Sequence, residues 1–261
     1  MIKRYLAVHK FYNFIRANKL APIAVKLKVL QACVTSSLLY NCETFGSRMP
    51  KKLESVYFSL IKCCLGVRPN TPNKLVLIES GLPTLESQIR CRQWTFYKRF
   101  LDNLDNNSDR KLVLDELRES QCDYLKHYMS LTSMYISKES IKQHYSNSLT
   151  QEIERLATHD NYKYEMYKKF NPGLEPVNLY NTPLRFIRLR LGSHYMPVET
   201  GRWKRIPREQ RLCPSCSTLG DEYHYIYDCP DINRSPDIPA LHELSSYNKL
   251  EFLLDNIDSY L

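Results

Sequence analysis

Four residues near the C-terminus, Cys213, Cys216, His224 and Cys229, stand in the order C-x2-C-x7-H-x4-C. Thiolates and imidazole are the usual ligands of zinc in proteins, and three sulfurs with one nitrogen fill a tetrahedral shell completely. A chain that brings these four side chains to one ion must fold its C-terminal segment around that point. We therefore expect one structural zinc ion (Zn2+) here, with no open position for water or substrate.

The spacing of the last ligand constrains the local fold. Five positions lead from His224 to Cys229, which on an ideal α-helix turns the two side chains about 140° away from a common side. Pro230 moves Cys229 out of the α region, so the spacing suits a metal ion if the helix breaks there. Asp221 is placed to cap the short helix that carries His224. The alternative is that all four ligands are core residues of a chain with nine cysteines.

The other six cysteines lie on helical patterns and have no histidine at ligand spacing. We expect them to be small core residues. The chain also has no apolar stretch long enough for a secretory signal or a membrane span, so we expect an intracellular protein, nuclear or cytoplasmic, with reduced thiols and no membrane contact. The six are Cys33, Cys42, Cys63, Cys64, Cys91 and Cys122.

Helical periodicity runs through most of the chain. Apolar residues recur at i+3 and i+4, only seven glycines occur in 261 residues, and no segment alternates polar with apolar positions. We therefore expect a mainly α protein: a helical bundle over residues 1–101, a polar linker with irregular helices over 102–180, and a basic helix with the zinc-binding region over 181–261. Local start and stop signals place helices over residues 3–18, 22–46, 51–66, 72–81, 84–101 and from 183 onward.

The basic charge is unevenly distributed. The formal net charge of +9 is made up of +13 over residues 1–101, −3 over 102–180, +6 over 181–212 and −7 over 213–261. Two basic segments suit a polyanion such as RNA or DNA if they share a face. If they do not, they indicate an ordinary solvated surface.

Basic and aromatic residues gather just before the metal motif. On the helix that begins near residue 183, Arg185, Arg188 and Arg190 are expected to face outward. Beyond it, Trp203 can stack on an unpaired base or, equally, cover the metal motif. The side chains that we expect to contact nucleic acid are Arg185, Arg188, Arg202, Trp203, Lys204, Arg205, Arg208 and Arg211.

The C-terminal motifs resemble those of a family of mobile-element proteins. The arginine-rich stretch TGRWKRIPREQRLC at residues 200–213 is followed by DEYH at 221–224 and by Cys-Pro at 229–230. This order is similar to the segment that ends the reverse transcriptase polyproteins of non-LTR (LINE-type) retrotransposons, which carry an arginine-rich lead and a CCHC zinc knuckle.

The upstream part carries the same resemblance. LLYNCETFG at residues 38–46 resembles the motif that follows the polymerase palm in such elements, and CLGV at 64–67 with ESGLP at 79–83 resembles their thumb-side motifs. The similarity spans nearly the whole chain and is weakest in the middle third. It implies that residues 1–101 form a thumb-like helical bundle and that the region from about residue 181 grips template RNA or target DNA.

The motifs do not predict an enzyme. Polymerases of that family hold two metal ions on an aromatic-x-Asp-Asp motif, and no Asp-Asp pair occurs in this sequence. The resemblance implies a non-catalytic, zinc-containing nucleic-acid-binding protein or fragment, with the polymerase part of a retrotransposon protein as a candidate partner. Two other interpretations stay open: a helical protein–protein interaction scaffold with a structural zinc, and a decayed reading frame without selected function.

Overall fold

The chain is mainly α in the residues that the structure describes. The structure is a computed structural model and describes residues 2–48, 51–102, 108–119, 123–158, 161–246 and 248–261. Within these segments the only β-type backbone pairing is an isolated antiparallel bridge between Leu212 and Leu219. No helix among them is both long and apolar enough to cross a bilayer. The fold class therefore agrees with the helical periodicity of the sequence.

The chain divides into two compact units that are interleaved along the sequence. Unit 1 takes residues up to 19, 28–60 and 82–152, and unit 2 takes 20–27, 61–81 and 153–261. The sequence pattern instead predicts three continuous segments, residues 1–101, 102–180 and 181–261. Helices α2 (Ile23–Val29), α4 (Lys51–Leu65) and α9 (Lys138–Leu156) contribute residues to both units.

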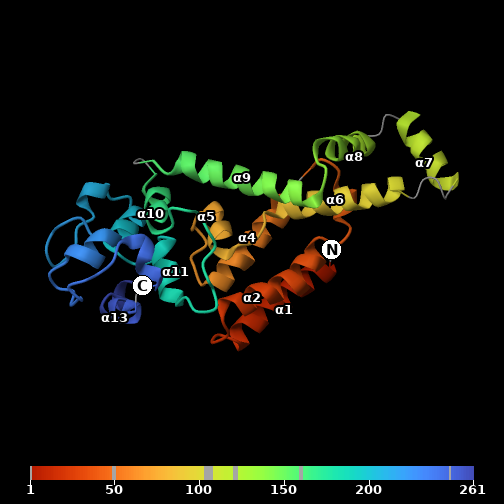
Figure 1. Cartoon of the computed structure of the whole chain (residues 1–261). Helices are drawn as coiled ribbons and strands as arrows, with labels where there is room; N and C mark the ends of the chain where they lie inside the picture. The colour runs from red at the N-terminus through yellow and green to blue at the C-terminus, as the bar shows by residue number, and fades with distance from the viewer. Residues whose placement is uncertain (1, 49–50, 103–107, 120–122, 159–160, 247) are drawn as a thin grey trace. The chain divides into compact units, whose positions relative to one another are not determined.

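Unit 1 is built around the long helix α6, beside which α8 lies (Figure 1). The rings of Tyr97 on α6 and Tyr128 on α8 stack with their centroids 5.3 Å apart. Thr84 starts α6 as the sequence predicts, because its hydroxyl accepts a hydrogen bond from the Ser87 N–H at 3.1 Å. The other elements of this unit are α1 (Ile2–Ala17), η1 (Leu30–Thr35), α3 (Ser36–Leu38), η2 (Cys42–Phe45), α6 (Leu85–Asp102), α7 (Ser108–Glu119) and α8 (Asp123–Met134).

The single helix expected over residues 22–46 is interrupted. Helix α2 runs into the π-turn η1, the chain returns briefly to α-helix in α3, and the 3-10 turn η2 follows. Ser36 donates its hydroxyl proton to Ala32 O at 2.5 Å and Ser37 donates to Cys33 O at 2.9 Å. Such side-chain hydrogen bonds compete with the backbone hydrogen bonds of an α-helix and favour a local departure from α-helical geometry. Gly46, with φ of 61°, then ends the segment where the sequence predicts.

The cysteines outside the metal motif have different environments. Cys42 and Cys64 are buried as expected, and burial raises the pKa of both thiols, which keeps them protonated near neutral pH. The expectation for Cys33 is wrong: it is exposed, because it lies on the side of η1 opposite to its buried residues. Cys63 and Cys91 are half-buried, and Cys122 lies outside the described residues.

In the described part of unit 2, short helices and loops pack around an apolar core. Phe186, Met196, Tyr225 and Leu254 belong to this core, and so do Cys213 and Cys229 of the metal motif. The ligands are therefore built into the centre of the unit rather than appended to it. Its further elements are α5 (Asn73–Ser80), α10 (Tyr162–Phe170), α11 (Leu184–Arg190), α12 (Pro197–Trp203), η4 (Arg208–Gln210), η5 (His224–Asp228), η6 (Leu241–Ser246), α13 (Leu250–Asn256) and η7 (Asp258–Tyr260).

Helix α11 buries Ile187, as its sequence pattern predicts, but two of its other residues depart from that pattern. Arg190, expected to face outward, is buried with 4% of its surface exposed, whereas Leu184 is 36% exposed. The reason is a charge partner: Arg190 Nε lies 3.0 Å from Glu79 Oε1, and Tyr167 donates to the same carboxylate at 2.9 Å. A buried arginine is tolerated where a carboxylate neutralises it.

Candidate metal centre

A tight hairpin presents the first two ligands. The Cys213 N–H donates to Thr218 O at 2.7 Å, and the Ser217 N–H donates to Cys213 O at 3.0 Å. Ser217 has a left-handed backbone (φ 57°) in the turn, and the bridge between Leu212 and Leu219 pairs the two arms. Because the backbone reverses within this single turn, the sulfurs of the C-x2-C pair lie on one side of it.

A π-turn brings the other two ligands together. The Asp221 carboxylate accepts a hydrogen bond from the His224 N–H at 3.0 Å, which confirms the predicted cap. The chain then forms η5, in which the Cys229 N–H donates to His224 O, five residues earlier, at 2.8 Å. This wider turn brings residues five apart nearly into register, so most of the offset expected for an α-helix is removed. Cys229 is extended (ψ 121°) before Pro230, at the predicted break.

The four candidate ligand atoms lie close enough together to share one metal ion. They all lie within 4.8 Å of one another. The Cys213 and Cys229 sulfurs are 3.9 Å apart, and the Cys216 sulfur is 3.2 Å from His224 Nε2. Bonds of about 2.3 Å to sulfur and about 2.0 Å to nitrogen would set these separations at about 3.8 Å and 3.5 Å in a regular tetrahedron. The described residues thus contain a Cys/His cluster that can bind a metal ion.

Local hydrogen bonds favour the thiolate form of Cys213. Burial raises the pKa of this thiol, but the Tyr225 hydroxyl and the backbone N–H groups of Ser215 and Cys216 act in the opposite direction, and the pKa is lowered. Thiolate is the form of cysteine that binds metal ions. The surroundings of Cys213 therefore favour the form of this side chain that could bind a metal ion.

The Thr218 hydroxyl lies against the histidine ligand. Its oxygen is 3.0 Å from His224 Nδ1 and 3.0 Å from the Cys216 sulfur. Since Nε2 faces the Cys216 sulfur, Nε2 is the nitrogen that would bind a metal ion. Nδ1–H would then donate to Thr218, an arrangement that would fix the ring. The ligand spacing does not reveal this residue, and its position two residues after Cys216 is the only signal in the sequence.

Replacing Thr218 with valine is expected to weaken metal binding about tenfold, because the variant keeps the side-chain shape but loses the hydrogen bond that orients His224. Competition of the full chain with a chromophoric zinc chelator measures this affinity. Ser215→Ala, at an exposed position of the same hairpin, is the matched control and should bind zinc as the unchanged protein does. Equal affinities for both variants would show that Thr218 does not orient the ligand.

A buried cluster of three polar side chains holds the helical segment that carries His224. Glu222 is 2% exposed, and its two carboxylate oxygens lie 2.7 Å from His194 Nε2 and 2.7 Å from the Tyr162 hydroxyl, which donates to it. Burial raises the pKa of Glu222, but these two partners outweigh it and the pKa is lowered. The group was missed in the sequence because its members come from three separate segments.

Two of the predicted nucleic-acid contacts, on α11, have protein partners. Arg185 Nη1 lies 2.5 Å from Asp255 Oδ1 and 3.2 Å from Asp258 Oδ1. Arg188 donates from Nε to Gly66 O at 2.9 Å. These two arginines therefore connect α11 to other parts of unit 2.

Arg211 ties the basic segment to the ligand hairpin. Its guanidinium donates to Ile206 O at 2.8 Å and to Val198 O at 2.9 Å. Gly201 allows this close approach, because a Cβ there would lie 2.5 Å from Arg211 Cγ. The Gly220 N–H donates to Arg211 O at 2.9 Å, and the Val198 N–H donates to Gly220 O at 3.0 Å. The hairpin, α12 and the loop after it are thus one hydrogen-bonded assembly.

The remaining basic side chains lie on or near the surface of this assembly. Arg202 is exposed and pairs with Glu199 at 2.9 Å, and Arg208 lies 3.5 Å from Asp221. Lys204 and Arg205 are exposed. The structure therefore brings three exposed cations together at the end of α12 and directs Arg185, Arg188, Arg208 and Arg211 toward protein groups.

Trp203 packs against Arg68 and Tyr195. The Arg68 guanidinium carbon lies 3.9 Å from the Trp203 ring centroid and 4.0 Å from that of Tyr195. The two rings meet edge to face, and both remain partly exposed. Trp203 thus belongs to an arginine–aromatic stack beside the exposed cations.

Comparison with protein-family models, curated proteins and solved structures finds no match to this chain. The geometry of the site itself is therefore the observation that bears on its function. That geometry consists of a Cys/His cluster inside the core of unit 2, joined by hydrogen bonds to an exposed basic segment.

Proposed function

We propose that this chain is a nucleic-acid-binding protein that holds one structural zinc ion and performs no polymerase chemistry. The observation that carries the proposal is the hydrogen-bonded link through Arg211 between the ligand hairpin and the exposed cations of residues 202–205. A derivation from the C-terminal part of a non-LTR retrotransposon reverse transcriptase rests on the motif resemblance.

Zinc is the ion that this donor set suits best. Three thiolates with one imidazole in a tetrahedral arrangement are typical of structural zinc sites, whereas magnesium and calcium prefer oxygen ligands. In this proposal all four coordination positions are filled by protein side chains, those of Cys213, Cys216, His224 and Cys229. A bound zinc ion would act on the fold, by fixing the hairpin and η5 to each other.

The exposed cations and aromatic rings at the end of α12 suit single-stranded RNA or DNA. Lys204 and Arg205 offer charges to phosphates, and the ring of Trp203 lies next to them in the chain. Single-strand-binding surfaces combine cations along the backbone with rings on which bases stack. The metal-bound hairpin would hold this segment in one conformation before the ligand arrives.

Replacing both Lys204 and Arg205 with glutamine is expected to lower the affinity for single-stranded RNA about tenfold near physiological salt. Two phosphate contacts are lost, so the slope of log K against log salt should become shallower by about 1.4. Fluorescence anisotropy of a short labelled oligonucleotide, titrated over a range of KCl concentrations with zinc-loaded protein, measures both quantities.

The matched control for this variant is Lys169→Gln with Lys249→Gln, which removes two exposed lysines of the same unit. Its salt slope should equal that of the unchanged protein. Equal effects of the two double variants would indicate a diffuse charge effect rather than an interface. A lack of binding by the unchanged protein at low salt would contradict the proposed function itself.

A protein-interaction scaffold is the second candidate, favoured by exposed apolar side chains on unit 1. Met129 and Met134 on α8 are exposed, and Ile136 just after it is 94% exposed. Such side chains are typical of surfaces that bind another protein. Affinity capture with and without nuclease separates the candidates, because a partner retained after nuclease treatment binds the protein directly.

A further inference from the structure

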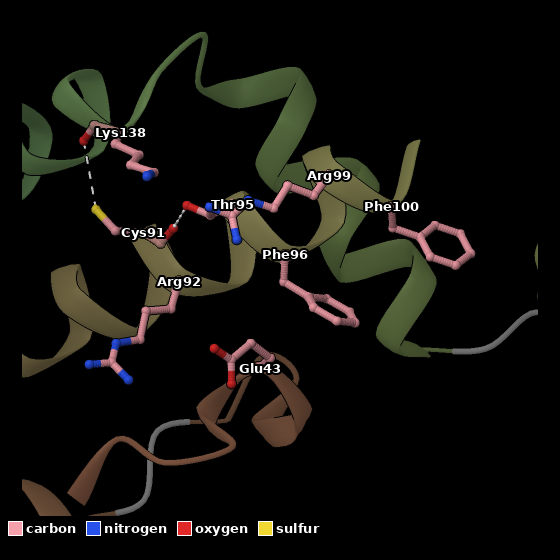
Figure 2. A pocket seen from close by; sticks show the side chains of 8 residues that line it. All are labelled: Glu43, Cys91, Arg92, Thr95, Phe96, Arg99, Phe100 and Lys138. Atoms are coloured by element: carbon pink, nitrogen blue, oxygen red, sulfur yellow. Dashed lines mark hydrogen bonds between the residues drawn. The ribbon is translucent and has the colours of Figure 1, made fainter. Parts of the chain in front are cut away.

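A cavity of about 650 Å³ opens in unit 1, lined by residues of η2, α6 and α9 (Figure 2). Arg92, Phe96 and Arg99 line it from α6, where their i, i+4 and i+7 spacing puts them on one face of the helix. Lys138, the first residue of α9, adds a third cation, and Glu43 on η2 is the one carboxylate among the lining residues. None of these residues belongs to the contacts predicted from the sequence.

The walls of the cavity are held by internal bonds. The Cys91 thiol donates to Lys138 O at 3.7 Å, and the Trp94 indole donates to Tyr135 O at 3.0 Å, so α6 is attached to the start of α9 and to the residues before it. Tyr128 donates its hydroxyl proton to Glu43 O, which fixes η2 to α8. The cavity is thus formed before any ligand binds.

Phe96 distinguishes this cavity from a simple anion site. Its side chain is 51% exposed although apolar, and its ring meets Tyr128 at a tilt of 51°, which supports it from one side. Figure 2 shows Phe96 and Arg92 projecting from α6 on the side where Glu43 lies. Cations on either side of an exposed ring, at one-turn spacing, match the alternation of phosphates and bases along a single strand.

We propose that this cavity binds one unpaired nucleotide of a single-stranded nucleic acid, with its base on the Phe96 ring and the flanking phosphates at Arg92 and Arg99. The inference rests on the proposed nucleic-acid-binding function and adds a second contact site in unit 1. The volume is within the range of small-ligand pockets. Arg92 donates to Leu39 O at 3.3 Å, which keeps its guanidinium at the cavity.

Glu43 gives the site a base preference. A carboxylate accepts a hydrogen bond from an exocyclic amino group, such as N4 of cytosine, and repels the carbonyl oxygen that uracil carries at the same position. The cavity therefore prefers cytosine to uracil. Glu43→Gln, whose amide can donate as well as accept, removes the preference.

The experiment compares oligo(C) and oligo(U) RNA of equal length on the zinc-loaded full chain by fluorescence anisotropy. Phe96→Leu is expected to weaken oligo(C) binding about tenfold through the loss of stacking, whereas Phe96→Tyr keeps an aromatic ring and weakens binding less. Arg99→Gln also weakens binding, while Lys98→Gln, which alters the adjacent exposed residue paired with Asp102, has a smaller effect.

The outcomes separate this site from the proposed function. If Phe96→Leu binds like the unchanged protein while Lys204→Gln with Arg205→Gln remains weakened, the nucleotide site is wrong and the proposed function stands. If the unchanged protein binds neither RNA, the proposed function fails. Equal weakening by Phe96→Leu and Phe96→Tyr, or an unaltered base preference in Glu43→Gln, overturns the assignment of stacking or of the amino contact, respectively.

Discussion

Removing the metal ion from the full chain with a chelator is expected to abolish the cooperative unfolding transition of unit 2. Cys213 and Cys229 are each 1% exposed and belong to the same core as Phe186 and Tyr225. Without the ion, buried thiolates would repel one another or take up protons, and the core would open. Structural zinc contributes about 10–16 kcal/mol in small zinc domains, as much as the whole net stability of many proteins.

Zinc content by elemental analysis and thermal melting followed by circular dichroism test this expectation together. Cys216→Ser should lose one zinc ion per chain and melt as the chelated protein does. Cys63→Ser, at a half-buried cysteine outside the cluster, is the control and should retain the metal. Unchanged zinc content in Cys216→Ser would mean that the ligand set is wrong.

The second large effect is expected at the ion pair between Glu79 and Arg190. Both side chains are buried, at 0% and 4% exposed, and Arg190 Nη2 donates to Glu79 Oε2 at 3.0 Å. Glu79→Gln leaves the arginine charge buried without a counterion, which is expected to cost about 3–5 kcal/mol of unfolding free energy. Urea denaturation of the zinc-saturated protein measures the loss.

Two comparisons test the cause of that loss. Glu79→Leu combined with Arg190→Met removes both charges and should recover most of the stability, since no unpaired charge remains. Glu165→Gln breaks the pair of Glu165 with Lys169, whose lysine is half exposed, and should cost less than about 1 kcal/mol. Similar losses for Glu79→Gln and Glu165→Gln would contradict the role given to the buried pair.

The features that the sequence predicted correctly depend on neighbouring residues. Thr84 caps α6, Gly46 and Gly66 end helical segments with positive φ, and Asp221 caps the ligand helix. Each is set by a few adjacent side chains and by backbone sterics. The Cys/His cluster was predicted for the same reason, since its four residues lie within one short segment.

The features that the sequence did not reveal depend on distant partners. Arg190 was assigned to the surface because charged side chains usually face solvent. Its partner Glu79 lies 111 residues away in the sequence, so no local pattern reveals the pair. Arg211 was expected to contact phosphate groups of a nucleic acid. Its guanidinium instead donates to the backbone carbonyls of Val198 and Ile206, which lie near it only in the folded chain. The π-turn at His224 was missed because helical spacing was counted at the α-helical period.

If both proposed ligands bind, Arg211 makes the occupancy of the metal ion and the affinity for the nucleic acid parts of one equilibrium. The hairpin that holds the metal ligands and the loop that displays Lys204 and Arg205 share its hydrogen bonds. Any molecule that binds the loop in its metal-bound conformation must therefore raise the affinity for zinc by the same factor by which zinc raises the affinity for that molecule. Such reciprocity would let a change in available zinc alter binding without any contact between the ion and the bound molecule.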